Sequence, residues 1–220
     1  MRTAVRDHFE FLRQFRQRFE TTGAIAPSSR YLAAAMTGPL KSRDRPARVL
    51  EVGPGTGAVT RRIVKLLKPD DRFDLVELNE TFAGMLTRRF EQDPAYRAVA
   101  DRSRVHVCPL QQFDAEGPFD YIISGLPLNN FSPELVGEIV ERYFQLLAPG
   151  GVLSYFEYMY VRPVRKLVSK PAERQRLTQL DEILHPVLER HRFQRNWVFV
   201  NVPPAWVQHL RNEDTAVETR

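Results

Sequence analysis

The sequence predicts an α/β fold built on a mostly parallel sheet. An apolar strand pattern at 48–52 leads into a glycine-rich turn and then a helical pattern, which is typical of a strand–turn–helix unit. Short apolar strand patterns then alternate with helical patterns between residues 72 and 157. The length of 220 residues fits one such domain with a full hydrophobic core.

The glycine-rich turn is the strongest signal of a ligand site. Residues 53–57 read GPGTG, so glycines stand at alternate positions directly after the strand. Glycine is required where the backbone takes a positive φ or lets a ligand approach closely, and the following helix offers unpaired N–H groups. The spacing differs from the G-x-G-x-x-G of dinucleotide-binding proteins, and no Lys-Ser or Lys-Thr pair follows as in a P-loop. The alternative is a structural turn that binds nothing.

Residues 51–57, EVGPGTG, resemble motif I of the class I S-adenosylmethionine (SAM)-dependent methyltransferases. The resemblance implies a Rossmann-like fold whose seven-stranded sheet has an antiparallel strand near its closing edge. It also implies SAM as cofactor and S-adenosylhomocysteine as product. In that family the turn passes under the methionine part of SAM, and the acid at the strand end lies near its amino group. The cofactor contacts implied here are Glu51, Gly53, Gly55, Thr56 and Gly57.

The second predicted strand, 72–78, ends in an acid that suits a ribose. Glu77 follows the glycine turn by about 20 residues, and an acid at this place in nucleotide-binding α/β folds accepts hydrogen bonds from the ribose hydroxyls. We therefore expect Glu77 and the adjacent Leu78 to contact the cofactor. A solvated glutamate at a strand end is the alternative.

The loops after the third and fourth predicted strands supply further candidates for contacts with the cofactor and the substrate. A third strand is predicted at 104–108, and the residues after it that are candidates for adenine contacts are Leu110, through its backbone, and Gln111. A fourth strand begins at 119, and ligands gather where the strands of such a sheet end. The loop after it supplies Ser124, Gly125 and Leu126 as cofactor contacts, and Pro127 and Leu128 as substrate contacts.

The N-terminal region, 1–40, is predicted to be distinct from a methyltransferase domain at 41–220. Residues 2–20 predict an amphipathic helix with a Phe-rich face edged by arginines. Such a helix either lies in a membrane interface or packs on the protein's own core, and both interpretations stay open. In the first case the region would dock on a membrane and cover the active site. Its substrate-binding candidates are His8, Ser28, Ser29 and Arg30.

Aromatic side chains meet cations between residues 155 and 166. Because arginine offers bidentate donors to phosphate, Arg162, Arg165 and Lys166 are candidates for binding a phosphate-bearing substrate. A solvated face is the alternative.

The last part of the chain predicts a helix and two closing strands. The helix has a core-facing stripe over 177–188, and Pro186 should kink or shorten it. The strands are predicted at 193–202 and 205–210.

Two further segments resemble a more specific family of methyltransferases. Residues 23–30 (GAIAPSSR) and 124–128 (SGLPL) are similar to bacterial phospholipid N-methyltransferases, and the resemblance covers most of residues 8–160. It implies methyl transfer from SAM to the primary amine of phosphatidylethanolamine, toward phosphatidylcholine; an ornithine lipid offers a similar amine. The related rRNA adenine dimethylases carry Asn-(Leu/Ile)-Pro-(Tyr/Phe) in the fourth-strand loop. Here Ser124 or Gly125 replaces that asparagine and Leu128 the aromatic residue, which argues against a planar base as substrate.

The implied reaction needs few protein groups. Methyl transfer from a sulfonium is an in-line displacement, in which positioning and desolvation carry most of the acceleration. The amine must lose a proton before it attacks, which requires an acceptor or a route to water. The candidates are Tyr158, Glu157 and Tyr31, and aromatic faces suit a cationic product. We expect no metal.

Composition limits the class of protein further. The single cysteine, Cys108, excludes an intrachain disulfide and a cysteine-based metal cluster. No apolar run approaches the ~18 residues that span a bilayer, and the charged N-terminus is unlike a secretory signal. We therefore expect a cytoplasmic monomer, associated peripherally with the inner membrane. The net charge of +5 suits partners that carry phosphate, either lipid headgroups or nucleic acid. The alternative functions are an RNA or DNA adenine N6-methyltransferase and a SAM-fold protein that binds without turnover.

Overall fold

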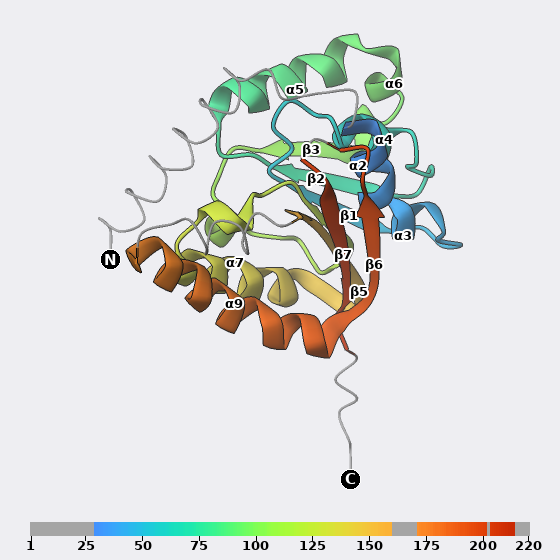
Figure 1. Ribbon diagram of the computed structural model, residues 1–220. Coiled ribbons are helices and arrows are strands. Elements are labelled where there is room, and N and C mark those ends of the chain that lie inside the picture. Colours follow the sequence, from blue (N-terminus) through green and yellow to red (C-terminus); the bar gives the residue numbers. More distant parts are fainter. Residues whose placement is uncertain (1–28, 160–170, 202, 214–220) are drawn as a thin grey trace.

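A seven-stranded sheet forms the centre of the computed structural model, which describes residues 29–159, 171–201 and 203–213 (Figure 1). The strands are β1 (Arg48–Val52), β2 (Arg72–Val76), β3 (Ser103–His106), β4 (Phe119–Ser124), β5 (Leu147–Tyr158), β6 (Arg192–Val198) and β7 (Ala205–Arg211). Their order is β3-β2-β1-β4-β5-β7-β6; β1 to β5 are parallel, and β7 runs antiparallel to β5 and β6. The predicted fold class is confirmed, whereas the amphipathic helix predicted at 2–20 lies outside the described residues.

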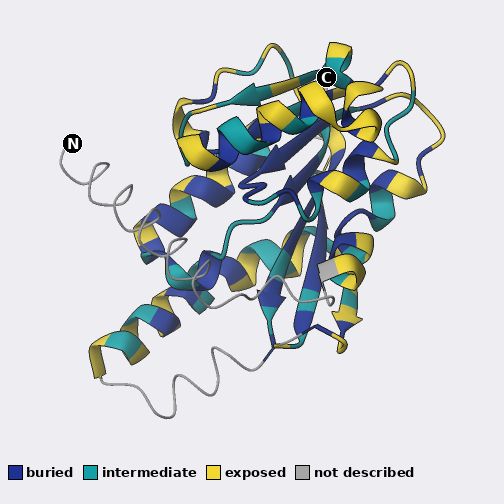
Figure 2. Ribbon diagram, turned by 90° about the horizontal axis from the view of Figure 1, so that it is seen from above, coloured by how far each residue is buried: buried dark blue, intermediate teal, exposed yellow. Residues whose placement is uncertain are grey.

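Helices cover both faces of the sheet (Figure 1). One face carries α2 (Ser29–Met36), α3 (Gly38–Lys41), α4 (Thr60–Val64), α5 (Glu80–Gln92) and α6 (Pro94–Arg97), and the other carries α7 (Pro133–Leu146) and α9 (Pro171–His191). Short 3-10 turns occur at Ala100–Arg102, Leu110–Gln112 and Leu128–Asn130. Each helix layer buries its own apolar cluster against the sheet, so the central strands are buried on both sides (Figure 2). In β1, Leu50 and Val52 join the α7–α9 cluster, and Val49 joins the cluster on the α2–α4 side.

The helices that follow β2 and β4 begin where the sequence places a cap. The Ser132 side chain accepts a hydrogen bond from the backbone N–H of Leu135 (3.3 Å), and Pro133 stands in the first turn of α7, as predicted. Asn79 caps α5 in the same way, accepting from the N–H of Thr81 (2.9 Å). Both helix N-termini are therefore fixed by local sequence.

Several elements differ in extent from the prediction. Strand β6 ends at Val198, before the predicted end at 202. Helix α9 continues to His191, so of the two effects predicted for Pro186, a kink or a shortened helix, the shortening does not occur. Proline removes the backbone hydrogen bond to the carbonyl four residues earlier, that of Glu182; both residues are exposed, so water can hydrate this carbonyl. Strand β5 begins earlier than the predicted start at 152, because Leu147 already pairs with Phe119 of β4.

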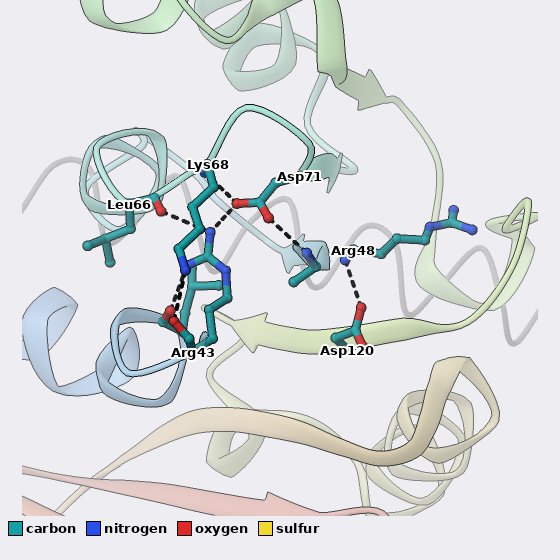
Figure 3. A network of polar contacts seen from close by, with 8 residues as sticks. Arg43, Arg48, Leu66, Lys68, Asp71 and Asp120 are labelled. Atoms are coloured by element: carbon teal, nitrogen blue, oxygen red, sulfur yellow. Dashed lines mark hydrogen bonds and ion pairs between the residues drawn. The ribbon is translucent and has the colours of Figure 1, made fainter. Parts of the chain in front are cut away.

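A buried ion pair joins the elements at the amino edge of the sheet (Figure 3). The Asp71 carboxylate pairs with Arg43 and accepts hydrogen bonds from the backbone N–H groups of Ala47 (2.8 Å) and Lys68 (2.6 Å). Arg43 also donates to the carbonyl of Leu66 (3.0 Å). Both charged side chains are almost completely buried. The pair therefore fastens the segment between α3 and β1 to the segment between α4 and β2.

We expect Asp71→Asn to lower the free energy of unfolding by about 3 kcal/mol, because removing one partner of a buried pair leaves the other charge uncompensated. Urea denaturation measures the change. The matched control is Asp70→Asn at the exposed neighbouring position, which should stay within about 0.5 kcal/mol of the unsubstituted protein. Equal losses for the two variants would contradict a structural role for the pair.

Candidate active site

The glycine turn lies at the carboxyl edge of the sheet. Gly53, Gly55 and Gly57 have φ of 68°, 57° and 78°, a region that side chains disfavour. Gly53 donates its N–H to the carbonyl of Val76 (2.9 Å), so the turn is tied to the end of β2. At Gly57 an added Cβ would lie 2.6 Å from Nη1 of Arg89. The turn therefore needs glycine both for its backbone conformation and for close packing.

Arg89 of α5 supports this turn. Its Nη1 donates a hydrogen bond to the carbonyl of Thr56 (2.7 Å). Burial raises the pKa of the neighbouring Tyr96 phenol; Arg89 opposes that rise, and the charge of Glu51 adds to it. Glu51, the acid predicted to lie near the methionine part of SAM, is buried in β1 two residues before Gly53. No local sequence pattern marks Arg89, because its partner Thr56 is distant along the chain.

Glu77 is fully buried directly after β2. Its Oε2 accepts a hydrogen bond from the N–H of Gly55 (2.8 Å), and its Oε1 accepts one from the N–H of Asn79 (2.9 Å). The carboxylate thus joins the glycine turn to the start of α5. Two acceptor oxygens fixed at this strand end fit the hydroxyl pair of a ribose. Leu78, the other candidate here, is half-buried.

The loop after β4 packs against the glycine turn. The buried Ser124 hydroxyl hydrogen-bonds the Tyr143 hydroxyl of α7 (2.6 Å) and accepts from the N–H of Leu126 (3.2 Å). An added Cβ on Gly125 would lie 2.6 Å from the carbonyl oxygen of Gly53. The Ser124 side chain is therefore directed at α7, and the backbone of Gly125 contacts the glycine turn.

The candidates for contacts with adenine and with the substrate differ in how far they are buried. Leu110 is buried in the α7–α9 cluster, whereas Gln111 is exposed, with its Nε2 3.5 Å from Oε2 of Glu138. Leu128 is buried in the same cluster, so its side chain belongs to the core. Pro127 is half-buried.

The two catalytic candidates on β5 lie on opposite faces of the sheet, as the alternation of side chains along a strand requires. Buried Glu157 accepts a hydrogen bond from the hydroxyl of Tyr155, which belongs to the α7–α9 cluster (2.9 Å). Tyr158 packs edge-on against Phe156 on the α2 side, with ring centroids 5.3 Å apart. Burial raises the pKa of the Tyr158 phenol, so this group stays protonated at neutral pH.

The third catalytic candidate, Tyr31, is exposed on α2, which packs against β5, β6 and β7. The Arg30 guanidinium lies over its ring, 4.7 Å from the centroid, and Nη2 of Arg30 donates to its hydroxyl (2.9 Å). Tyr31 and Tyr158 thus share one side of the sheet, and Glu157 lies on the other. The candidates before residue 29 and after β5, which are His8, Ser28, Arg162, Arg165 and Lys166, lie outside the described residues, as does the side chain of Ser29.

Sequence reasoning missed a second arginine contact, beside the loop after β4. Arg176 of α9 donates to the backbone carbonyls of Asn129 (3.2 Å) and Phe131 (2.7 Å). Oδ1 of buried Asn129 has no hydrogen-bond partner among the described residues. Helix α9 therefore helps to fix this loop, although it is far along the chain.

No group of three or more His, Cys, Asp or Glu side chains is placed to hold a metal ion within residues 29–159, 171–201 and 203–213. Over the same residues, no helix combines the length and the apolar character that a membrane crossing requires.

Comparisons with known proteins agree with this arrangement. A family model described as a methyltransferase domain matches residues 50–153. The ornithine lipid N-methyltransferase of Singulisphaera acidiphila is 31% identical over 156 residues, which cover 70% of this chain and 80% of that protein. The ribosomal RNA small subunit methyltransferase A of Hydrogenovibrio crunogenus is 31% identical over 88 residues, 40% of this chain and 32% of that one. Among solved structures, the 1,6-didemethyltoxoflavin-N1-methyltransferase of Burkholderia thailandensis, bound to S-adenosylhomocysteine, has a TM-score of 0.61 at 20% identity, covering 96% of this chain and 89% of its own.

We expect Glu77→Gln to raise the dissociation constant of SAM about 10- to 100-fold, because a hydrogen bond to a charged acceptor contributes roughly 1.5–3 kcal/mol. Isothermal titration calorimetry measures the affinity. Glu80→Gln, at an exposed position in the first turn of α5, removes the same charge nearby and should leave it unchanged. An unaltered dissociation constant in Glu77→Gln would contradict the ribose role of Glu77.

Proposed function

This chain belongs to the class I SAM-dependent methyltransferases, as its motif predicted, with SAM as cofactor, and on that premise we propose that it methylates the primary amine of a membrane aminolipid. The observation that carries the proposal is the match to the ornithine lipid N-methyltransferase, which extends over 80% of that protein. The acceptor class proposed is the amine shared by ornithine lipids and phosphatidylethanolamine.

The residues at the carboxyl edge fit the cofactor. The turn from Gly53 to Gly57 carries no side chain at its three positive-φ positions, and Glu77 supplies fixed acceptors for a ribose. When bound, SAM supplies an electrophilic methyl group for an in-line displacement. The loop at 124–126 then limits where the acceptor can lie, since Gly125 packs directly on the turn.

Glu157 is the proposed acceptor of the amine's proton. Its carboxylate lies next to the carboxyl end of β5 and is oriented by the Tyr155 hydroxyl. Tyr158 is a weaker candidate, because burial raises the pKa of its phenol and keeps the proton on it. Its ring, with that of Phe156, instead suits contact with a cationic amine. We therefore assign proton transfer to Glu157 and positioning to Tyr158.

A nucleic-acid substrate is the second candidate, and two observations favour it. The net charge is +5, and the match to the ribosomal RNA methyltransferase is 31% identical. That match spans only 32% of the relative, and the loop at 124–128 lacks the asparagine and the aromatic residue that would hold a base. The aminolipid proposal has the broader support.

Methyl transfer from labelled SAM tests the two substrates directly. Liposomes of phosphatidylethanolamine or of ornithine lipid, neutral liposomes without an amine, and total RNA are assayed in parallel. We expect label in at least one aminolipid and none in the amine-free lipid. Label in RNA alone would contradict the proposal, and no transfer to any acceptor would favour a protein that binds SAM without turnover.

We expect Glu157→Gln to lower kcat by a factor of about 10²–10⁴, the usual range for loss of a general base, with the SAM dissociation constant unchanged. Tyr158→Leu, which removes the aromatic ring, should raise KM for the lipid more than it lowers kcat. The matched control is Glu182→Gln on the exposed face of α9, which should retain full activity. Full turnover in Glu157→Gln would remove Glu157 from the mechanism.

A further inference from the structure

Exposed hydrophobic side chains gather at the far end of the β6–β7 hairpin. Trp197 is 52% exposed, Phe199 64% and Val200 61%. The Trp197 and Phe199 rings stack with centroids 5.6 Å apart, and Trp197 meets Trp206 of β7 edge-on at 5.7 Å. We call Trp197, Phe199 and Val200 the hairpin platform. Its rings hold one another in place, so its shape exists before any partner binds.

The hairpin platform lies at the same edge of the sheet as the glycine turn. Strand β6 is antiparallel to β7, which is antiparallel to β5, so β6 and β5 run in the same direction and end at the same edge (Figure 1). Helix α9 ends at His191, where β6 begins, so the helix meets the other end of this strand. The hairpin platform thus lies at the end of β6 away from α9.

The contacts between β5 and β7 place this platform close to the proposed catalytic residues. Glu157 pairs with Trp206 across the two strands. Beyond them, the N–H of Met159 donates to the carbonyl of Pro204 in the hairpin loop (2.7 Å). The hairpin loop, which carries Phe199 and Val200, is therefore hydrogen-bonded to the end of β5, two residues beyond Glu157.

The hairpin that carries the platform contains basic but no acidic residues. Residues 192–211 contain no aspartate or glutamate, and the nearby Glu157 of β5, which pairs with Trp206, is buried. Exposed Arg195 lies over the Trp206 ring, 5.3 Å from its centroid. Tryptophan beside arginine is suited to a surface that is apolar inside and anionic outside, because the ring enters the apolar layer and the guanidinium stays at the headgroups.

From these observations we propose that the hairpin platform docks the protein on an anionic phospholipid surface and so holds the active-site edge at the level of the lipid headgroups. This inference rests on the proposed aminolipid function. A stacking site for single-stranded RNA would also combine aromatic rings with arginine. The membrane fits better because Val200, which is 61% exposed at the tip, is apolar and offers no ring for a base. The loop also satisfies some of its own polar groups, since Nδ2 of Asn201 donates to the carbonyl of Pro203 (2.7 Å).

The chain carries its own reporters for this test, because its two tryptophans are Trp197 and Trp206. The full-length protein is mixed with vesicles of phosphatidylethanolamine and phosphatidylglycerol, with and without brominated acyl chains. We expect the tryptophan emission to shift to shorter wavelength and to be quenched by the brominated lipid. Vesicle sedimentation without a change in emission would overturn the proposal, since the protein would then bind through another surface. An emission change with RNA and none with vesicles would also overturn it.

Two matched variants localise the contact. Phe199→Ser should raise the apparent dissociation constant for the vesicles about tenfold, as expected for the loss of one inserted aromatic side chain. Phe193→Ser removes an exposed aromatic side chain from the other end of β6 and should leave vesicle binding unchanged. Equal binding by Phe199→Ser and the unsubstituted protein would contradict docking through the hairpin.

The docking inference and the proposed function fail separately. Methylation of an aminolipid dispersed in detergent micelles does not require docking on a bilayer, so activity there with no vesicle-induced emission change would reject docking alone. Quenching by brominated vesicles without methylation of any aminolipid would support docking and reject the substrate.

Discussion

The buried carboxylate of Glu77 fixes the geometry on which the cofactor site depends. A charge removed from water is tolerated only where hydrogen bonds satisfy it, and here the N–H groups of Gly55 and Asn79 do so from two different elements. The turn after β1 and the start of α5 are thereby held at the end of β2. Arg89 adds a contact from α5 to the same turn, through the carbonyl of Thr56. Within the described part of the chain, the cofactor site is thus built from strand ends and one helix.

The proposed acceptor side of the site is subject to different constraints. Strand β5 alternates its side chains between two hydrophobic clusters, so Glu157 and Tyr158 reach the edge of the sheet from opposite faces. This separation suits a division of roles, in which a carboxylate takes a proton and aromatic rings face the amine. The proposed docking surface continues from the same strand end through the pairing of Glu157 with Trp206. Chemistry and membrane contact would then share one edge of the sheet.

The parts of this structure that sequence predicts well are those with local causes. The glycine turn and the cap at Ser132 follow from residues that are neighbours in the chain. Contacts between distant residues are different, because no local pattern marks them. The Ser124 hydroxyl is occupied by Tyr143, and Arg89 reaches Thr56 from another helix. For Pro186, the sequence shows that one backbone hydrogen bond of the helix is lost. The loss is tolerable because Pro186 lies at an exposed position of α9, which is known only from the fold.

The most direct test of the account identifies the methylated product itself. A total lipid extract containing aminolipids is incubated with the full-length protein and SAM that carries a deuterated methyl group, and the lipids are analysed by fragmentation mass spectrometry. We expect a mass increase in lipids with a primary amine, with the deuterated methyl group on the fragment that contains this nitrogen. A deuterated methyl group found only on oxygen, or only in lipids without an amine, would contradict it.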